Sequence, residues 1–203
     1  MAAVERPLEP TDEALLERAR GGDRAAFAHL VIRYQEKFYR LASSLVPNPS
    51  DAEEVLQDSF LQAYRSLEYF RGDAKVSTWL YRIVTNTALM KRRAMRRHPA
   101  ESLESYQPQF REDGRLERLD LDYGRAARVE DILEKEELAA KAREAIEILP
   151  ETSREAFVLH DLEGLSTEAT SEVLGIEPGA VRTRLHRARL ALRGYLARLV
   201  GGA

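Results

Sequence analysis

Arginine is the residue type whose placement in this sequence most clearly suggests a chemical role. The stretch from Pro178 to Ala203 contains no aspartate or glutamate, and it carries Arg182, Arg184, Arg187, Arg189, Arg193 and Arg198. Guanidinium groups bind the edges of guanine bases and the phosphates of nucleic acids. Arginines at this density favour a nucleic-acid-binding surface, and the alternative is a solvated basic helix that closes a helical bundle.

Two helices joined by a tight turn are predicted to hold these arginines. Ser166 or Thr167 can cap a first helix that ends at Leu174. Gly175 suits a left-handed residue after a helix end, and Pro178 suits the first turn of the next helix. Residues 165–198 therefore predict a helix-turn-helix. The second helix begins with small residues and has one apolar side, which consists of Val181, Leu185, Ala188, Leu192 and Leu199. One flank carries Ala180, Thr183, Arg184 and Arg187, and the other flank carries Arg182, Arg189 and Arg193.

A second basic face is predicted in the middle of the chain. Phe70 to Val76 has the composition of a loop, and Ser77 or Thr78 is expected to cap a helix that begins at Trp79. The core positions of that helix are Leu80, Ile83, Val84 and Thr87, and another face carries Trp79, Arg82, Asn86, Met90, Arg93 and Arg97. This face suits single-stranded nucleic acid, because bases stack on aromatic rings while arginines follow the backbone. A half-buried core position is the alternative for Trp79.

The segment from Ser50 to Phe70 predicts a helix with an acidic outer side. A capping box of Ser50 and Glu53 is expected to begin it. The buried positions are Ala52, Val55, Leu56, Ser59, Phe60, Ala63 and Leu67, while Glu54, Asp58, Leu61 and Arg65 face the other way. A leucine within an acidic stripe indicates a partner-binding surface. The alternative is a solvated charged face with one isolated leucine.

The composition limits the possible classes of function. The chain has 203 residues, a net charge of −3 and no cysteine, so neither a basic nucleic-acid coat nor a thiolate metal site is expected. Because it has no Gly-rich phosphate loop, metal-ligand spacing or nucleophile elbow, we expect a protein that is not an enzyme and uses no metal or cofactor. No apolar run approaches the ~18 residues of a membrane span, which predicts a soluble, cytoplasmic protein.

Helical periodicity along the chain predicts an all-α fold. A first helix is expected after Thr11 or Asp12, with Leu15, Leu16 and Ala19 inward and Gly21-Gly22 at its end. Asp23 is expected to cap the next helix, whose core residues are Phe27, Leu30, Val31, Tyr34, Phe38, Leu41 and Leu45. A helix from Val129 to Leu149, with Ile132, Leu133, Ala142, Ile146 and Leu149 as its apolar positions, and one opened by a capping box of Thr152 and Glu155 precede the helix-turn-helix.

A long polar segment separates the two halves of the chain. Residues 99–128 contain Pro99, Pro108, Gly114 and Gly124 among many charges. This length exceeds a tight connection, so we predict two small helical domains joined by a flexible linker. The expected boundaries are a flexible tail at 1–10, a first domain at 11–98, a linker at 99–129 and a second domain at 130–200.

Together these motifs resemble bacterial sigma factors of the sigma-70 family, of the small extracytoplasmic-function (ECF) class. They are Asp51-Ala52-Glu53-Glu54-Val55 with Gln57-Asp58-Ser59-Phe60; Phe70-Arg71-Gly72-Asp73; Thr78-Trp79-Leu80-Tyr81-Arg82-Ile83 with Asn86-Thr87-Ala88; and Leu149-Pro150, Gly164-Leu165-Ser166, Leu174-Gly175 and Val181 to Arg189. They occur in the family's order and span almost the whole chain beyond the first ten residues. Thr170 and Ser171 depart from the family, which usually has Ile-Ala or similar there. The Thr170 hydroxyl, at an inward position, is expected to bond a backbone carbonyl.

The resemblance implies an initiation subunit that binds core RNA polymerase, through its beta and beta-prime subunits, and promoter DNA, in a stress or envelope response. It implies polymerase contacts at Asp51, Glu54, Gln57, Asp58 and Leu61. It implies contacts to the promoter −10 element at Phe70, Arg71, Gly72, Asp73, Ala74, Val76, Trp79, Arg82, Asn86, Lys91 and Arg93. It implies contacts to the −35 element at Thr167, Glu177, Gly179, Ala180, Arg182, Thr183, Arg184 and Arg187.

The resemblance also implies an anti-sigma partner that masks these surfaces and can hold the protein at a membrane, and a linker that threads through the polymerase. A free-standing helix-turn-helix regulator is the alternative function. It explains residues 165–198 but gives no role to the acidic stripe or to the face that carries Trp79. An all-α adaptor without a DNA role would leave the arginines unexplained.

Overall fold

The computed structural model describes residues 9–95 and 141–201, and every regular element in these two ranges is helical. The chain divides into two compact units, Met1–Ala94 and Met95–Ala203. The predicted all-α fold of two helical domains is therefore confirmed. In the described part of the chain, no helix is long and apolar enough to cross a membrane. The predicted linker, the N-terminal tail up to residue 8 and the start of the predicted helix at 129–149 lie outside the described residues.

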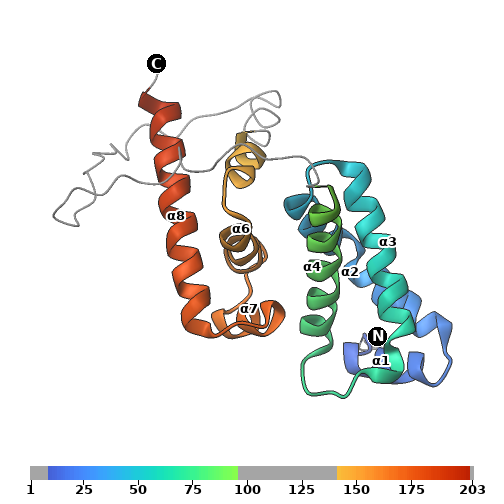
Figure 1. Ribbon diagram of the computed structural model, residues 1–203. Helices are drawn as coiled ribbons and strands as arrows, with labels where there is room; N and C mark the ends of the chain where they lie inside the picture. Colours follow the sequence, from blue (N-terminus) through green and yellow to red (C-terminus); the bar gives the residue numbers. More distant parts are fainter. Residues whose placement is uncertain (1–8, 96–140, 202–203) are drawn as a thin grey trace, which may run out of the picture. The chain divides into compact units, whose positions relative to one another are not determined.

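The first unit packs its helices around one phenylalanine. Its elements are α1 (Asp12–Arg20), α2 (Arg24–Leu45), α3 (Pro49–Arg65), the 3-10 turn η1 (Leu67–Tyr69) and α4 (Val76–Met95), as Figure 1 shows. The fully buried Phe38 ring lies 5.0 Å from that of Tyr34, 5.1 Å from Tyr81 and 6.1 Å from Phe60, centroid to centroid. These contacts join α2 to α3 and α4, so the two helices that carry the acidic and basic faces share one core.

The predicted start of the first helix at Thr11 and Asp12 and the predicted cap Asp23 are confirmed. The Thr11 hydroxyl accepts from the Ala14 N–H at 3.2 Å, and the Asp23 carboxylate accepts from the N–H groups of Ala25 and Ala26. Arg18 also binds Asp23, and its hydrogen bond is the main cause that lowers the pKa of this carboxyl below 3.8. Side-chain acceptors thus satisfy N–H groups at the first turns of α1 and α2.

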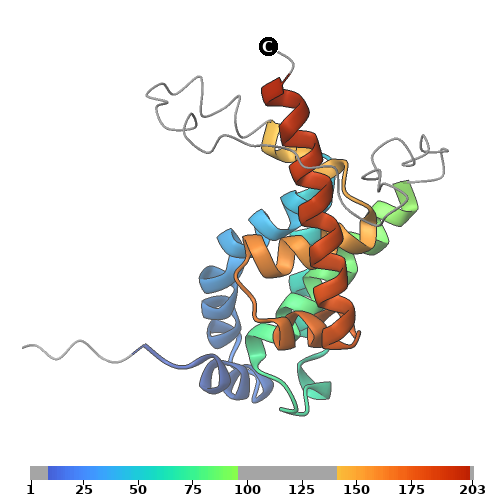
Figure 2. The same cartoon turned by 90° about the vertical axis from the view of Figure 1, so that its left-hand side faces the viewer.

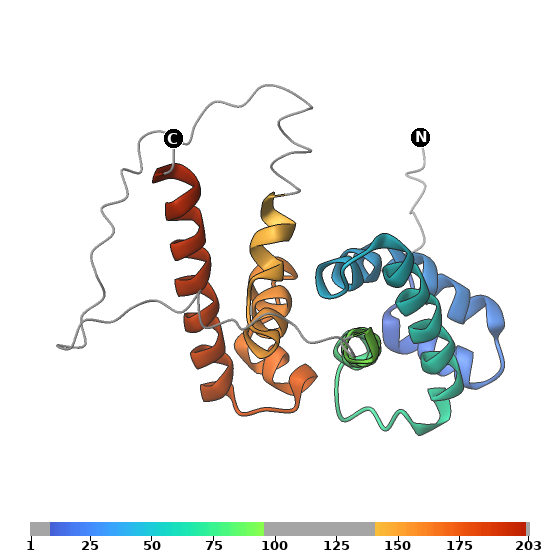
Figure 3. The ribbon, with the colours of Figure 1, turned by 45° about the horizontal axis from the view of Figure 1, so that its top comes forward.

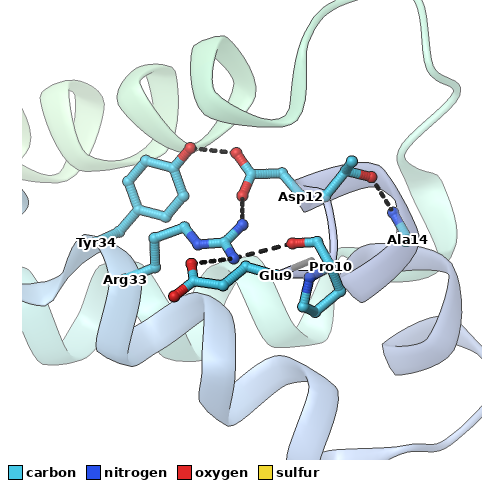
Figure 4. A network of polar contacts seen from close by, with 7 residues as sticks. Glu9, Pro10, Asp12, Ala14, Arg33 and Tyr34 are labelled. Carbon is cyan, nitrogen blue, oxygen red and sulfur yellow. Dashed lines mark hydrogen bonds and ion pairs between the residues drawn. The ribbon is translucent and has the colours of Figure 1, made fainter. Parts of the chain in front are cut away.

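A network of polar contacts fixes the start of α1 on α2 (Figure 4). The Tyr34 hydroxyl and the Arg33 guanidinium both donate to the carboxylate of Asp12. Arg33 also donates to the backbone oxygen of Pro10 at 2.9 Å, and it lies 3.7 Å from the Glu9 carboxylate. Burial and the Asp12 carboxylate raise the pKa of Tyr34 well above its usual 10.0. The phenol therefore stays a neutral donor at physiological pH.

Two predicted helix starts in this unit are wrong. Asn48, rather than Ser50, caps α3, and its side-chain oxygen accepts from the Asp51 N–H at 3.0 Å. Pro49 explains the difference, because proline favours the first helical position, where an N–H would have no partner. The helix α4 begins at Val76 and not at Trp79, so Ser77 and Thr78 lie inside its first turn. Val76 is completely buried, which anchors this turn on the core.

The second unit contains a helical stretch at 141–147, α6 (Glu151–Phe157), the π-helical turn η3 (Val158–Leu162), α7 (Thr167–Leu174) and α8 (Pro178–Gly201). Figures 1 and 3 show α6 and α8 side by side. Ala156, Val181 and Leu185 are buried between them, with Leu174 and Ile176 packed against this cluster. Of the apolar positions expected for the helix at 129–149, Leu149 is buried, Ile146 is partly buried and Ala142 is exposed.

The predicted capping box of Thr152 and Glu155 is wrong. The helix α6 begins at Glu151 directly after Pro150, Thr152 is exposed, and no side chain caps the first turn. The buried Arg154 instead satisfies the end of the preceding helical stretch. Its guanidinium donates to the carbonyls of Ile146 at 2.8 Å, of Leu149 at 2.9 Å and of Glu147. Carbonyls at a helix end need such partners when they are withdrawn from water.

The helix-turn-helix is confirmed in its local chemistry. Ser166 caps α7 by accepting from the Ala169 N–H at 3.1 Å, and Gly175 ends α7 in the left-handed conformation, with a φ of 64°. Pro178 is the first residue of α8. Figure 2 shows α7 and the start of α8 joined by this short turn. Because α8 begins directly after this turn, the N-terminal half of α8 lies next to α7.

Thr170 departs from the expectation. Its side chain is completely buried, and within the described residues its hydroxyl has no hydrogen-bond partner. The hydroxyl was expected to bond a backbone carbonyl. A buried hydroxyl without a partner loses its hydrogen bonds to water and gains nothing in return.

Candidate interaction surfaces

The outer side of α3 has the predicted acidic stripe. Glu54, Gln57 and Asp58 are exposed, and Leu61 keeps 53% of its surface in contact with solvent. Ala52, Val55, Ser59 and Ala63 lie on the opposite side of α3 and are buried. A large exposed leucine between carboxylates costs solvation free energy in the free protein, and a partner that covers it would recover this cost.

Asp51 is less accessible than the other acidic residues of α3. Its side chain is only 14% exposed, and the Lys91 ammonium of α4 lies 3.4 Å from its Oδ1 and 2.6 Å from Oε2 of Glu54. The hydrogen bond with Glu54 is the main cause that raises the pKa of Lys91. Lys91 was predicted to contact DNA, and the two carboxylates were predicted to contact another protein. In the free protein the fold brings the three side chains together.

An apolar groove beside the acidic stripe was not found by the sequence reasoning. Its volume is about 530 Å³, and it is lined by Arg24, Phe27, Ala28, Val31, Ile32 and Tyr64. Ile32 is 66% exposed and Tyr64 is 43% exposed. The Phe27 and Tyr64 rings meet edge to face at 5.1 Å, which closes the groove between α2 and α3. The available signal was Ile32, an isoleucine outside the apolar stripe of its helix.

The groove and the acidic stripe form one continuous surface. Tyr64 lies three residues after Leu61 on α3, so their side chains are neighbours on the helix surface. The helix α2 adds Ile32 and Val31 on the other side of Tyr64. We call this combined area, Glu54, Asp58, Leu61, Tyr64 and Ile32, the docking face.

The loop before α4 folds against the tryptophan that follows it. The rings of Phe70 and Trp79 lie 5.1 Å apart and are tilted by 53°. Arg71, Gly72 and Asp73 are exposed, and Gly72 has a φ of 78°, a conformation that favours glycine. Ala74 and Trp79 are half-buried. A half-buried aromatic pair next to an exposed loop provides a stacking surface for a base.

The outer face of α4 carries the predicted basic and amide side chains. Arg82, Asn86 and Arg93 are exposed, and Met90 is exposed between them. Two further residues that were predicted to contact DNA are not part of this exposed face. Val76 is buried in the core, and Lys91 binds the acidic residues of α3. Arg97 lies outside the described residues.

The arginines of α8 separate into two groups. Arg182 and Arg187 are exposed, whereas Arg184 is partly buried, with its Nη1 at 3.6 Å from Oε2 of Glu155. Arg189 binds Asp161 with two hydrogen bonds of 2.7 and 2.9 Å. Arg189 is the main cause, and His160 a further one, that lowers the pKa of Asp161, and Asp161 in turn raises the pKa of Arg189. Carboxylates of α6 and η3 thus fix α8 on its own unit.

The remaining residues predicted at this site surround the turn. Glu177, Gly179 and Thr183 are exposed, and Thr167 and Ala180 are partly exposed. The Thr183 hydroxyl donates to the Gly179 carbonyl at 3.1 Å within α8. No aspartate or glutamate lies in the described part of α8, so a polyanion can approach its exposed arginines without repulsion from that helix.

Comparison with known proteins finds two matching family models. The model described as Sigma-70 region 2 matches residues 30–98, and the one described as Sigma-70, region 4 matches residues 139–192. The ECF RNA polymerase sigma-E factor of Escherichia coli (strain K12) is 38% identical over 192 residues, which cover 94% of this chain and 96% of that protein. The protein of the same name from Haemophilus influenzae is 39% identical over 189 residues, which cover 88% and 92%.

Two solved structures have a similar fold. The structure of CnrH in complex with the cytosolic domain of CnrY matches with a TM-score of 0.66 and 26% identity, over 91% of this chain and 96% of that chain. The sigma factor RpoE in complex with the anti-sigma factor NepR from Bartonella quintana matches with a TM-score of 0.59 and 22% identity, over 84% and 96%. The second likeness supports the fold alone.

Proposed function

Because the chain belongs to the sigma-70 family and is a sigma factor of the ECF class, we propose that its three surfaces divide the work of transcription initiation. The protein is a transcription initiation factor and not an enzyme. The docking face binds core RNA polymerase, the loop and outer face of α4 bind the −10 element, and the exposed start of α8 binds the −35 element.

Polymerase docking is supported by the chemistry of the docking face. Asp51, Glu54, Gln57, Asp58 and Leu61 are the residues proposed to meet the clamp helices of the beta-prime subunit. Carboxylates around an apolar centre match a partner helix that has basic and apolar side chains. The groove between α2 and α3 extends this contact, because Tyr64 adjoins Leu61 and Ile32 is exposed in the same groove.

Capture of the −10 element is supported by the loop and the aromatic pair. Phe70, Arg71, Gly72, Asp73 and Ala74 precede the helix that presents Trp79, Arg82, Asn86 and Arg93. A base taken out of a duplex costs a few kcal/mol of stacking and pairing, and a stacking surface beside exposed arginines offsets this cost. Val76 is buried and is therefore left out of the proposed contacts.

Binding of the −35 element is supported by the exposure of the first turns of α8. A helix with a small-residue start enters the major groove with its N-terminal half. Gly179, Ala180, Arg182, Thr183 and Arg187 are proposed to face the base edges and phosphates. Thr167 and Glu177 flank them. Arg184 reaches the DNA only by leaving Glu155, so we assign it a smaller contribution.

Regulation by an anti-sigma factor is proposed for the same surfaces. Relatives in the solved structures were found as complexes with a cytosolic domain and with an anti-sigma factor. A partner that covers the docking face would block polymerase, and one anchored in a membrane would retain this cytoplasmic protein there. The alternative, a free-standing regulator, gives no role to the docking face and is not favoured.

The single observation that carries the proposal is the exposed Leu61 among carboxylates on α3. The test is a titration of labelled full-length protein with core polymerase. Glu54→Lys combined with Asp58→Lys should weaken binding, by roughly 2–5 kcal/mol if the charges become buried on docking. Glu13→Lys combined with Glu17→Lys makes the same change in net charge at exposed positions of α1 and should bind normally. Equal affinities for the two variants would contradict the assignment of α3.

A further inference from the structure

Lys91 links the two functional faces of the first unit. It extends from α4, whose outer face carries Arg82, Asn86 and Arg93, and it ends between two carboxylates of α3. The distances are 2.6 Å to Glu54 and 3.4 Å to Asp51, and the Lys91 side chain is 25% exposed. The positive charge of Lys91 is therefore paired with carboxylates of the protein itself, although the outer face of α4 is the proposed binding surface for the promoter strand.

The two carboxylates that bind Lys91 differ in how accessible they are to solvent. Asp51 and Glu54 lie three residues apart on one helix, where like charges repel each other, and Lys91 neutralises this repulsion. Glu54 is 56% exposed and belongs to the docking face, so a basic side chain of the polymerase can reach it. Asp51 is only 14% exposed, and its contact with Lys91 is the longer of the two.

We propose that core polymerase takes over Glu54 from Lys91, and that the released ammonium then binds a phosphate of the promoter single strand. This inference rests on the proposed function, since it assumes that polymerase binds the docking face and that the strand binds α4. We call the contact of Lys91 with Asp51 and Glu54 the tie. In the free protein the tie holds Lys91 away from DNA and places two carboxylates where a phosphate would approach. Polymerase binding removes one of them and completes the basic face.

The exchange is feasible because the pair is exposed enough to open. Partly exposed ion pairs contribute little to the free energy of folding, so a basic side chain of the polymerase can replace Lys91 beside Glu54. Coupling between two binding sites is also reciprocal. Bound single-stranded DNA therefore raises the affinity for polymerase by the same factor by which polymerase raises the affinity for DNA. The pair disfavours unproductive binding of the free protein to single strands.

Binding of a short fluorescein-labelled single-stranded DNA of mixed sequence to the full chain tests the tie at low salt. Contacts to phosphate do not depend on sequence, so no promoter is needed. Glu54→Gln removes a negative charge and frees Lys91, and it should bind the strand about two- to fivefold more tightly than the unaltered protein, the range of a single exposed ion pair. Asp58→Asn removes a negative charge from the same helix without touching Lys91, and its gain should be clearly smaller.

A double variant isolates the pair. In a Lys91→Gln background, Glu54→Gln should lose its advantage over Asp58→Asn, because the residue that it frees is absent. In the holoenzyme, formed with saturating core polymerase, Lys91→Gln should weaken strand binding by a larger factor than in the free protein. Equal losses in the two states would overturn the exchange, as would equal gains from Glu54→Gln and Asp58→Asn.

Arg82→Gln separates this inference from the function on which it rests. If Arg82→Gln weakens strand binding while Glu54→Gln behaves like Asp58→Asn, the α4 face binds DNA and only the tie is wrong. If Arg82→Gln, Lys91→Gln and Glu54→Gln all leave strand binding unchanged in the free protein and in the holoenzyme, the −10 assignment falls and the tie falls with it. Circular dichroism of each variant confirms that the helices are retained.

Discussion

Charge partners decide which side chains of α8 are available for DNA. Asp161 holds Arg189 with two hydrogen bonds, and Glu155 lies 3.6 Å from Arg184. Arg182 and Arg187 are exposed near the start of the helix. Arg184 and Arg189 therefore position the helix, whereas Arg182 and Arg187 are exposed to solvent.

Replacement of Arg187 should reduce transcription from promoters that carry the cognate −35 element. For Arg187→Ala we expect a loss of roughly 1–3 kcal/mol in binding of that duplex if the guanidinium contacts a base. Arg193→Ala, an exposed arginine further along the same helix, should have a smaller effect. The measurement is binding to duplexes that differ only in the −35 element. A loss that is the same on every sequence would show that Arg187 binds phosphate alone.

The buried hydroxyl of Thr170 should be a source of instability. Valine has the same shape without the hydroxyl, so Thr170→Val should raise the free energy of unfolding of the second unit by about 1 kcal/mol. Thr183→Val is the matched control, because that threonine is exposed and its hydroxyl donates to the Gly179 carbonyl. Urea unfolding of the full chain compares the two. Destabilisation by Thr170→Val would mean that the hydroxyl has a bonding role.

At the scale of elements, α2 and α3 act together as one surface. The T-shaped contact of Phe27 with Tyr64 closes the groove between them, and Leu61 and Ile32 are exposed on its two sides. The shared aromatic core around Phe38 keeps both helices fixed relative to α4. Docking of polymerase on α3 is therefore expected to depend also on Ile32, an uncharged residue of α2.

A charge in the groove should weaken binding to polymerase without unfolding the protein. Ile32→Glu places a carboxylate among Phe27, Val31 and Tyr64, and it should lower the affinity for core polymerase by roughly 2 kcal/mol or more, since an unpaired charge would be covered on docking. Its stability should change by no more than about 0.5 kcal/mol, because Ile32 is largely exposed. Ala14→Glu adds the same charge at an exposed position of α1, away from the groove, and it should bind polymerase like the unaltered protein.

At the scale of the whole molecule, the two units carry separate tasks. The loop and α4 lie in Met1–Ala94, whereas the helix-turn-helix lies in the second unit. Recognition of the −35 duplex needs no unstacked base, while capture of the −10 strand does. Damage to one unit should therefore leave the task of the other intact.

The split should be visible when Asn86→Ala is combined with a shortened 71–75 loop. The holoenzyme should still assemble and still bind the −35 duplex, because the docking face and α8 are unchanged. Permanganate footprints of the open bubble should disappear, and transcripts with them. A template that is already melted at −10 should restore activity only in part, since base capture is still missing. Full bubble formation on a closed duplex would show that opening is driven elsewhere.

The sequence by itself determined the features that depend on near neighbours along the chain. Helical periodicity predicted the all-α class, and the helix start at Thr11 and Asp12, the cap Asp23, a cap at Ser166 or Thr167 and the left-handed Gly175 were predicted correctly. These features rest on contacts within about one helical turn, which the order of residues already contains. Two capping boxes were wrong because a neighbouring proline offered a competing helix start, at Pro49 and at Pro150.

Only the tertiary structure decided which charges meet and which apolar residues remain exposed. Periodicity placed Glu54 on an outer face and the family resemblance implied a DNA contact for Lys91, but the packing of α3 against α4 brought the ammonium within 2.6 Å of the carboxylate. Packing likewise buried Val76, paired Arg189 with Asp161 and left Ile32 beside a groove. The reason is geometric: a helical pattern fixes the direction of a side chain from its own axis, whereas its neighbour depends on the crossing of two helices far apart in the sequence.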